Sequence, residues 1–279
     1  MIIDMHTHIF HDEVIENRAA HLDDEPEFAL LYESDKSKMI GADALVAIMD
    51  EEGVDKSVVF GFPWREKKRF KANNDAVIEA VKKFPDRLIG MACFDLASPF
   101  AAEETKRCFD EGLKGVGELA FYKSGIDEAA LEVMEPVMAL CKDADLPVII
   151  HTNEPVGHDY PGKTPITLGQ IYNLAARYPE NRICLCHFGG GIFFYNLLKK
   201  QAKETLKNLW FDTAASPYLF DATIYEVSAR FAGEDRILFG SDYPLLKPSR
   251  YIKEIDANIK DEGLKRKILG ENAASFLHI

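Results

Sequence analysis

Short runs of apolar residues alternate with segments of helical hydrophobic spacing along most of the chain. The runs begin near residues 2, 56, 87, 114, 147, 182, 209 and 236. Each run has the length of a buried strand, and the segments between them are typical of amphipathic helices, as Leu45, Ile48 and Met49 illustrate. Eight such units predict parallel strands joined by right-handed helical crossovers.

Closing eight strand–helix units gives an α/β fold, the (β/α)8 or TIM barrel, which usually takes about 250 residues. The alternative, a doubly wound open sheet, would need a glycine-rich phosphate turn after an early strand, and the sequence has none. Because no low-complexity linker interrupts the 279 residues, we expect a single domain over 1–279. Residues 9–40 form an irregular acidic segment that is long for a loop, and we expect a lid or an insertion there.

Three local signals set the expected helix boundaries. Asn74 is a candidate helix cap. Thr164 followed by Pro165 predicts the start of another helix. Pro136 lies inside the helix expected over about 127–142 and should kink or divide it.

Composition and charge exclude several classes of protein. No apolar run approaches the roughly 20 residues that cross a bilayer. The N-terminus shows no signal-peptide pattern, and the five scattered cysteines are typical of reduced core thiols, so we expect a cytoplasmic protein. The net charge of −13 argues against nucleic acid and anionic membranes as partners. A small-molecule substrate is expected, and a homo-oligomer stays open.

Histidines and carboxylates gather at the ends of the predicted strands, where such barrels carry their chemistry. His6 and His8 end the first strand and, being two residues apart, should point to one face. The fourth, fifth, sixth and eighth strands contribute Glu118, His151, His187 and Asp242. Imidazole and carboxylate groups are ligands for divalent metals, so this grouping predicts a catalytic metal site. Singly, each residue could instead be a core histidine or a carboxylate that caps a helix.

Four motifs of the chain resemble the amidohydrolase superfamily: Asp4-x-His6-x-His8, Ile150-His151-Thr152, His187-Phe188-Gly189-Gly190 and Phe239-Gly240-Ser241-Asp242-Tyr243-Pro244. They are most similar to its "amidohydrolase 2" branch, which is related to aminocarboxymuconate-semialdehyde decarboxylase. Leu269-Gly270-Glu271-Asn272-Ala273-Ala274 also matches that branch. The resemblance spans nearly the whole chain and implies a TIM-barrel, metal-dependent enzyme.

The resemblance also implies roles for residues. His6, His8, His151 and Asp242 would bind a divalent metal, most often zinc, and His187 would contact substrate or water. Binuclear relatives place a glutamate after the fourth strand, where Glu118 stands, so a second metal position is expected there. Decarboxylase members generally lack that carboxylate. We therefore expect a hydrolase that cleaves a C–O or C–N bond of a small carbonyl substrate, with non-oxidative decarboxylation as the alternative.

The expected hydrolysis uses these groups in a simple order. Asp242 would take a proton from a metal-activated water and pass it to the leaving group, and His187 would polarise the carbonyl. Arg65, His158 and Lys163 are candidate substrate-binding residues, because they lie in loops after the second and fifth strands. A solvated Arg65 is the alternative there. A lyase or hydratase, and a non-catalytic metal-buffering barrel, are the other classes of function considered.

Overall fold

Eight parallel strands follow the apolar runs of the sequence in the computed structural model, which describes all 279 residues. Two sheets have the strand orders β1-β2-β3 and β4-β5-β6-β7-β8, and every neighbouring pair is parallel. The strands are β1 (Ile3–His8), β2 (Lys56–Phe60), β3 (Leu88–Gly90), β4 (Val116–Leu119), β5 (Val148–Ile150), β6 (Ile183–Leu185), β7 (Leu209–Asp212) and β8 (Ile237–Leu238).

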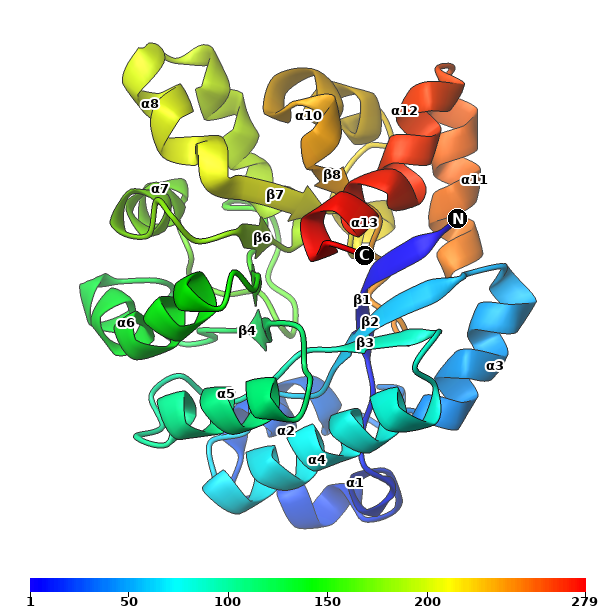
Figure 1. Ribbon diagram of the computed structural model, residues 1–279, viewed down its shortest axis with the longest axis vertical. Helices are drawn as coiled ribbons and strands as arrows, with labels where there is room; N and C mark the ends of the chain where they lie inside the picture. Colours follow the sequence, from blue (N-terminus) through cyan, green and yellow to red (C-terminus); the bar gives the residue numbers. More distant parts are fainter.

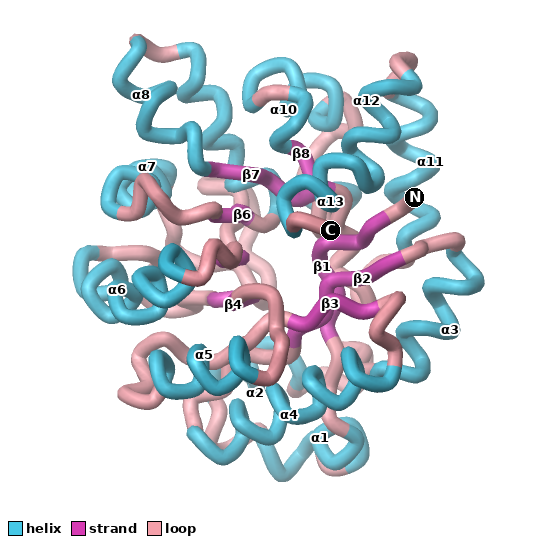
Figure 2. Tube along the Cα trace, viewed as in Figure 1, coloured by secondary structure: helices cyan, strands magenta, loops and turns pink.

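Parallel bridges join the two sheets at both seams. Ala92, just after β3, pairs with Val116 of β4. Thr7 of β1 pairs with Tyr243, which follows β8. The strands therefore surround a common axis, with the helices outside them (Figures 1 and 2). The predicted (β/α)8 barrel is confirmed.

Helices connect successive strands across the outside of the barrel. The longer ones are α3 (Ala42–Glu52), α4 (Lys67–Lys83), α5 (Ala101–Asp110), α6 (Glu128–Asp143), α7 (Leu168–Arg177), α10 (Ile224–Ala232) and α11 (Pro248–Asn258). Shorter segments are η2 (His187–Leu197), α8 (Lys200–Thr205), α9 (Ser216–Leu219), α12 (Glu262–Arg266) and α13 (Asn272–Leu277). None of the helices combines the length and the apolar character that crossing a membrane requires.

The apolar core has two layers. A cluster of 55 buried residues fills the space between the strands and the outer helices. A second cluster of 14 residues fills the barrel itself, and it includes Met5, Phe60 and Ile149 from three different strands. Phe276 and Leu277 of α13 pack into this inner cluster, so the last helix covers one end of the barrel. The opposite end of the barrel, at the C-terminal ends of the strands, therefore remains open for a functional site.

Two helices begin at residues other than those the sequence indicated. α4 begins at Lys67, and Asn74 lies buried within it. Its amide donates to Glu104 and its carbonyl accepts from the Cys93 N–H, each at 2.9 Å, so tertiary partners satisfy a side chain that otherwise favours caps. α7 begins at Leu168, because Thr167 and Gln170 form a capping box beyond the Thr164-Pro165 signal. Pro136 also fails to divide α6, which is continuous from Glu128 to Asp143.

Residues 9–40 contain more structure than their sequence indicated. They form α1 (Asp12–Glu16), the 3-10 turn η1 (Arg18–His21) and α2 (Pro26–Tyr32). The buried carboxylate of Glu25 accepts hydrogen bonds from the backbone N–H groups of Arg65 and Glu66, both at 3.1 Å. The segment is thus fastened to the loop after β2, at the end of the barrel where the strands finish.

Candidate active site

The strand ends of the barrel surround a cavity of about 580 Å³. Its floor is made by His8, Glu118, His151, His187 and Asp242, with the fully buried His6 directly behind them. These are the six residues that the sequence placed at strand ends. The volume lies within the range of small-molecule sites.

His6 and His8 converge on one carboxylate oxygen from each of two residues. Their Nε2 atoms lie 3.2 Å apart. Asp242 Oδ1 lies 3.5 Å from His6 Nε2 and 3.3 Å from His8 Nε2. Glu118 Oε2 lies 3.6 Å and 3.7 Å from the same two nitrogens. Each of the two carboxylate oxygens therefore lies close to both histidine nitrogens.

The other oxygen of Glu118 faces a second group of histidines. Glu118 Oε1 lies 2.9 Å from His151 Nδ1 and 3.8 Å from His187 Nε2. These two ring nitrogens are 3.3 Å apart. Glu118 thus stands between two three-residue groups, His6–His8–Glu118 and Glu118–His151–His187, each compact enough to hold a metal ion.

Further polar contacts fix the orientation of the histidine rings. His8 Nδ1 lies 3.2 Å from the carbonyl oxygen of Gly61, and His187 Nδ1 lies 2.8 Å from that of Ala214. In both rings this contact leaves Nε2 facing the floor of the cavity. Such outer contacts select the tautomer that a metal-binding histidine needs.

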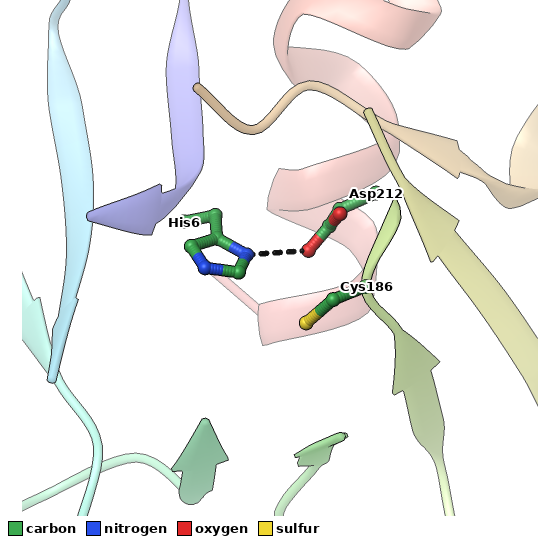
Figure 3. Close-up of side chains that lie close together, drawn as sticks. All are labelled: His6, Cys186 and Asp212. Atoms are coloured by element: carbon green, nitrogen blue, oxygen red, sulfur yellow. Dashed lines mark hydrogen bonds and ion pairs between the residues drawn. The ribbon is translucent and has the colours of Figure 1, made fainter. Parts of the chain in front are cut away.

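Asp212 ends β7 and belongs to none of the motifs found in the sequence. Its Oδ2 lies 2.9 Å from His6 Nδ1, and Cys186 lies beside the pair (Figure 3). Its other oxygen accepts the backbone N–H of His187 at 2.9 Å and that of Ala214 at 3.0 Å. Asp212 therefore positions two site histidines. Its place at a strand end was the signal that could have identified it.

The backbone at two site residues adopts the left-handed region. His187 has φ 56° and Asp242 has φ 57°, which few non-glycine residues adopt. Glycines next to both make the close packing possible. A Cβ at Gly190 would lie 2.4 Å from the carbonyl oxygen of Asn153, and one at Gly240 would lie 2.9 Å from the Cβ of His6. The Gly189-Gly190 and Gly240-Ser241 motifs therefore serve the positions of the side chains beside them.

Buried carboxylates control the protonation of His6. Burial lowers the pKa of His6, but Glu118, Asp212 and Asp242 outweigh it and raise that pKa to about 10. Burial raises the pKa of Glu118, while His6 and His151 hold it well below its ordinary value. The floor of the cavity thus favours positive charge, and protons compete with a metal cation for the same nitrogen atoms.

The donor set fits a divalent metal ion. Four imidazoles and two carboxylates lie together, and their side chains are between 0% and 16% exposed. Nitrogen and oxygen donors of this kind suit zinc, manganese and similar cations. The structure places Glu118, and not His151 as the resemblance implied, beside His6, His8 and Asp242, and these four residues could hold one ion. His151 lies with His187, for which substrate or water contact was expected, and these two could share Glu118 with another ion.

The three candidate substrate-binding residues lie in different surroundings. His158 lines the cavity. Arg65 does not line it, and its side chain is 54% exposed and 3.7 Å from Asp95. The ammonium group of Lys163 lies 3.0 Å from the Glu154 carboxylate and also donates to the carbonyls of Val156 and His158. Its partners therefore all lie within its own loop. The positions of Arg65 and Lys163 therefore do not support contact with a ligand in the cavity.

Aromatic side chains line the walls of the cavity, among them Tyr32, Phe62 and Tyr122. The Phe62 and Tyr122 rings are nearly parallel, with an interplanar angle of 8°. Tyr122 also packs against the His151 ring at 5.6 Å between centroids. The sequence did not single out these residues, because they follow no metal-binding motif. Flat apolar walls of this kind suit a flat aromatic ligand.

Known proteins similar to this chain match it along nearly its whole length. A family model described as amidohydrolase matches residues 3–279. A gamma-resorcylate decarboxylase from Rhodococcus jostii is 25% identical over 293 residues, covering 85% of this chain and 87% of that protein.

Solved structures with the same fold include two 5-carboxyvanillate decarboxylases. The one from Sphingomonas paucimobilis has a TM-score of 0.78 at 18% identity, covering 100% of this chain and 99% of that one. The one from Novosphingobium aromaticivorans, complexed with manganese and 4-hydroxy-3-methoxy-5-nitrobenzoic acid, has a TM-score of 0.78 at 17% identity, covering 100% and 96%.

These relatives contradict the expectation of a hydrolase, because they are decarboxylases. That expectation depended on Glu118, taken as a feature that decarboxylases lack. In the structure Glu118 lies between two histidine groups and can act as a metal ligand, a role that does not select water as the nucleophile. The alternative of non-oxidative decarboxylation agrees with the relatives.

Proposed function

The chain belongs to the amidohydrolase family, and from this premise we propose that it is a metal-dependent, non-oxidative decarboxylase of a small carboxylated aromatic compound. The observation that carries the proposal is the cavity itself. Side chains that could bind a metal ion form its floor, and aromatic side chains form its walls. The similarity to gamma-resorcylate decarboxylase supports the same reaction class.

His6, His8, Glu118 and Asp242 would hold the principal divalent cation. When bound, the cation supplies positive charge that draws the substrate's carboxylate and an adjacent hydroxyl to the floor and disperses their negative charge. Manganese is a candidate for this cation beside the expected zinc, because a solved relative is complexed with manganese. His151 and His187, which share Glu118, form a second and weaker position for a cation.

Asp242 is the residue proposed to move the proton. Burial raises the pKa of Asp242, but His6 and His8 outweigh it and hold that pKa far below its ordinary value. Asp242 is therefore ionised at neutral pH, and it would accept the proton of a hydroxyl next to the substrate's carboxylate once a bound cation raised the acidity of that hydroxyl, and then deliver the proton to the ring carbon. The carbon–carbon bond then breaks, carbon dioxide leaves, and the bond's electron pair returns through the ring to the phenolate oxygen.

His187 and the aromatic walls are proposed to position the substrate. Burial and the neighbouring His151 lower the pKa of His187, so its ring is neutral near pH 7. When the second cation position is empty, the free Nε2 of this neutral ring can form a hydrogen bond to the substrate without adding charge. Phe62 and Tyr122 would hold the substrate's ring flat and exclude water from the carbon that receives the proton. The five buried free cysteines support a cytoplasmic location for this enzyme.

The experiment that tests the proposal is a substrate panel. Protein loaded separately with zinc and with manganese is incubated with gamma-resorcylate, 5-carboxyvanillate and salicylate, and the decarboxylated products are separated and quantified. We expect turnover of at least one acid. The His6→Ala/His8→Ala variant should keep its fold but lose both bound metal and turnover. Metal-loaded wild-type protein that converts no carboxylated aromatic would contradict the proposal.

A further inference from the structure

Two lysines at the cavity stand out because no carboxylate neutralises them. Lys36 and Lys38 are exposed and line the cavity, and neither lies within ion-pair distance of an acidic side chain. They are the only lysine or arginine residues in its lining. The sequence also suggested Arg65 and Lys163 as residues that bind an anion. Arg65 instead forms an ion pair with Asp95, and Lys163 forms one with Glu154.

Hydrogen bonds hold the segment that carries these lysines. The guanidinium of Arg18 donates to the carbonyl oxygens of Ser34 and Ser37, both at 2.7 Å. The hydroxyl of Ser37 donates to the carbonyl of Leu31 at 2.7 Å. The turn between α2 and α3 is therefore fastened on both sides of Lys36. These hydrogen bonds lie within the 9–40 segment, so they hold the shape of the turn from which the two lysine side chains extend.

The acidic and the basic side chains of this turn line two different hollows. Glu33 and Asp35 line a separate hollow beside residues 15–22 on the protein surface, whereas Lys36 and Lys38 line the active-site cavity. The acidic residues of the turn thus lie along a different surface from the lysines. In a chain with net charge −13, this puts local positive charge at a cavity that anions must enter.

We propose that Lys36 and Lys38 select substrates that carry a second carboxylate in addition to the one removed. This inference rests on the proposed function and names its substrate class, an aromatic dicarboxylate. One carboxylate lies at the floor of the cavity, the ring lies against the aromatic wall to which Phe62 and Tyr122 belong, and the other carboxylate reaches the two lysines. The lysines make this second contact because no other permanent cation lines the cavity.

The test compares the binding of two probes to metal-loaded protein by calorimetry. Isophthalate has two carboxylates on one ring, and benzoate has one. The variant Lys36→Gln/Lys38→Gln removes both charges. The control Lys253→Gln/Lys260→Gln removes two charges from exposed lysines outside the cavity. Because an exposed ion pair contributes modestly, we expect the first variant to bind isophthalate about five- to tenfold more weakly. Its benzoate affinity and both affinities of the control should change less than about twofold.

Each other outcome overturns the inference. Equal weakening of isophthalate and benzoate would show general attraction of anions without selection of a second carboxylate. Unchanged affinity for both probes would show that the lysines do not contact the ligand. Because binding is measured without turnover, the result is separate from the reaction. If the probes bind as expected but no aromatic acid is decarboxylated, the proposed reaction fails while the selection by Lys36 and Lys38 stands.

Discussion

The carboxylate of Asp212 lies 2.9 Å from Nδ1 of His6, and both side chains are fully buried. This contact occupies one ring nitrogen and leaves Nε2 facing His8, Glu118 and Asp242. The Asp212 carboxylate therefore selects the tautomer of His6 in which Nδ1 carries the proton and Nε2 can bind a cation.

Replacing Asp212 with asparagine should weaken metal binding. The remaining oxygen can still accept the N–H groups of His187 and Ala214, so the amide nitrogen would face His6 Nδ1 and favour the opposite tautomer. We expect a loss of about 10- to 100-fold in affinity for zinc or manganese, measured by competition with a chelating dye. Asp95→Asn, a change outside the metal-binding group, is the control. Wild-type affinity in Asp212→Asn would contradict the role given to this residue.

Glu118 should determine how many cations the protein holds. Titration of the metal-free protein with zinc or manganese should give two bound equivalents, the second weaker than the first, because Glu118 turns one oxygen to each histidine group. Glu118→Gln should retain at most one equivalent, since an amide is a poorer ligand with one oxygen. If wild type binds one equivalent at saturation and Glu118→Gln binds the same, Glu118 acts only as a neighbour of the ligands.

Two loops beside the cavity are predicted to close over a bound ligand. Residues of the 9–40 segment and of 152–164 both line the cavity, and both segments follow strands that carry candidate metal-binding histidines. Limited proteolysis should therefore cut both segments several-fold more slowly when 4-hydroxy-3-methoxy-5-nitrobenzoic acid is bound to the metal-loaded protein. Cutting at other exposed loops is the internal control. Equal cleavage with and without the ligand would count against a lid.

A buried ion pair away from the cavity should make stability depend on pH. Burial raises the pKa of Glu104, but hydrogen bonds from Arg107 and Asn74 outweigh it and hold that pKa below its ordinary value of 4.5. The ionised Glu104 carboxylate thus adds to the free energy of unfolding at pH values above 4.5. This added stability is lost as the pH falls through the pKa of Glu104 in the folded protein.

Glu104→Gln should therefore reduce the free energy of unfolding by about 1–3 kcal/mol at pH 7. The difference in free energy of unfolding between this variant and wild type should become smaller as the pH falls below about 4. Urea unfolding of the metal-free protein at several pH values measures both effects. Glu103→Gln, which changes a mostly exposed neighbour, should differ little from wild type at any pH. A gap that stays constant with pH would exclude charge on Glu104 as its cause.

Much of the fold and the metal-binding group could be predicted from the sequence. Each strand is an apolar run, and the rule that barrel chemistry lies at strand ends brings together residues as distant as His6 and Asp242. Asp212 obeys the same rule but was overlooked, because it belongs to no recognised motif. The prediction of the fold succeeded because local pattern and topology together determine where the strands lie, whereas the metal-binding role of the residues at their ends stays a prediction.

Long side chains and reaction type could not be predicted in the same way. Arg65 and Lys163 lie in loops near the site, yet their partners Asp95 and Glu154 become apparent only once the chain is folded. Glu118 lies at the end of its strand as predicted, but a carboxylate at this position does not by itself indicate hydrolysis. One arrangement of ligands supports several reactions, and the fold alone does not choose among them.

Isotope labelling tests the central claim most directly. Metal-loaded protein is incubated in deuterium oxide with gamma-resorcylate that carries carbon-13 in its carboxylate, and gas and aromatic product are analysed by mass spectrometry and NMR. We predict carbon-13 dioxide in equal amount to resorcinol, with one deuterium on the carbon that lost the carboxylate. If Lys36 and Lys38 select a second carboxylate, an isophthalate that bears a hydroxyl next to its carbon-13-labelled carboxylate should be decarboxylated faster than gamma-resorcylate. Recovery of all the carbon-13 in aromatic carboxylate from every such substrate would contradict decarboxylation.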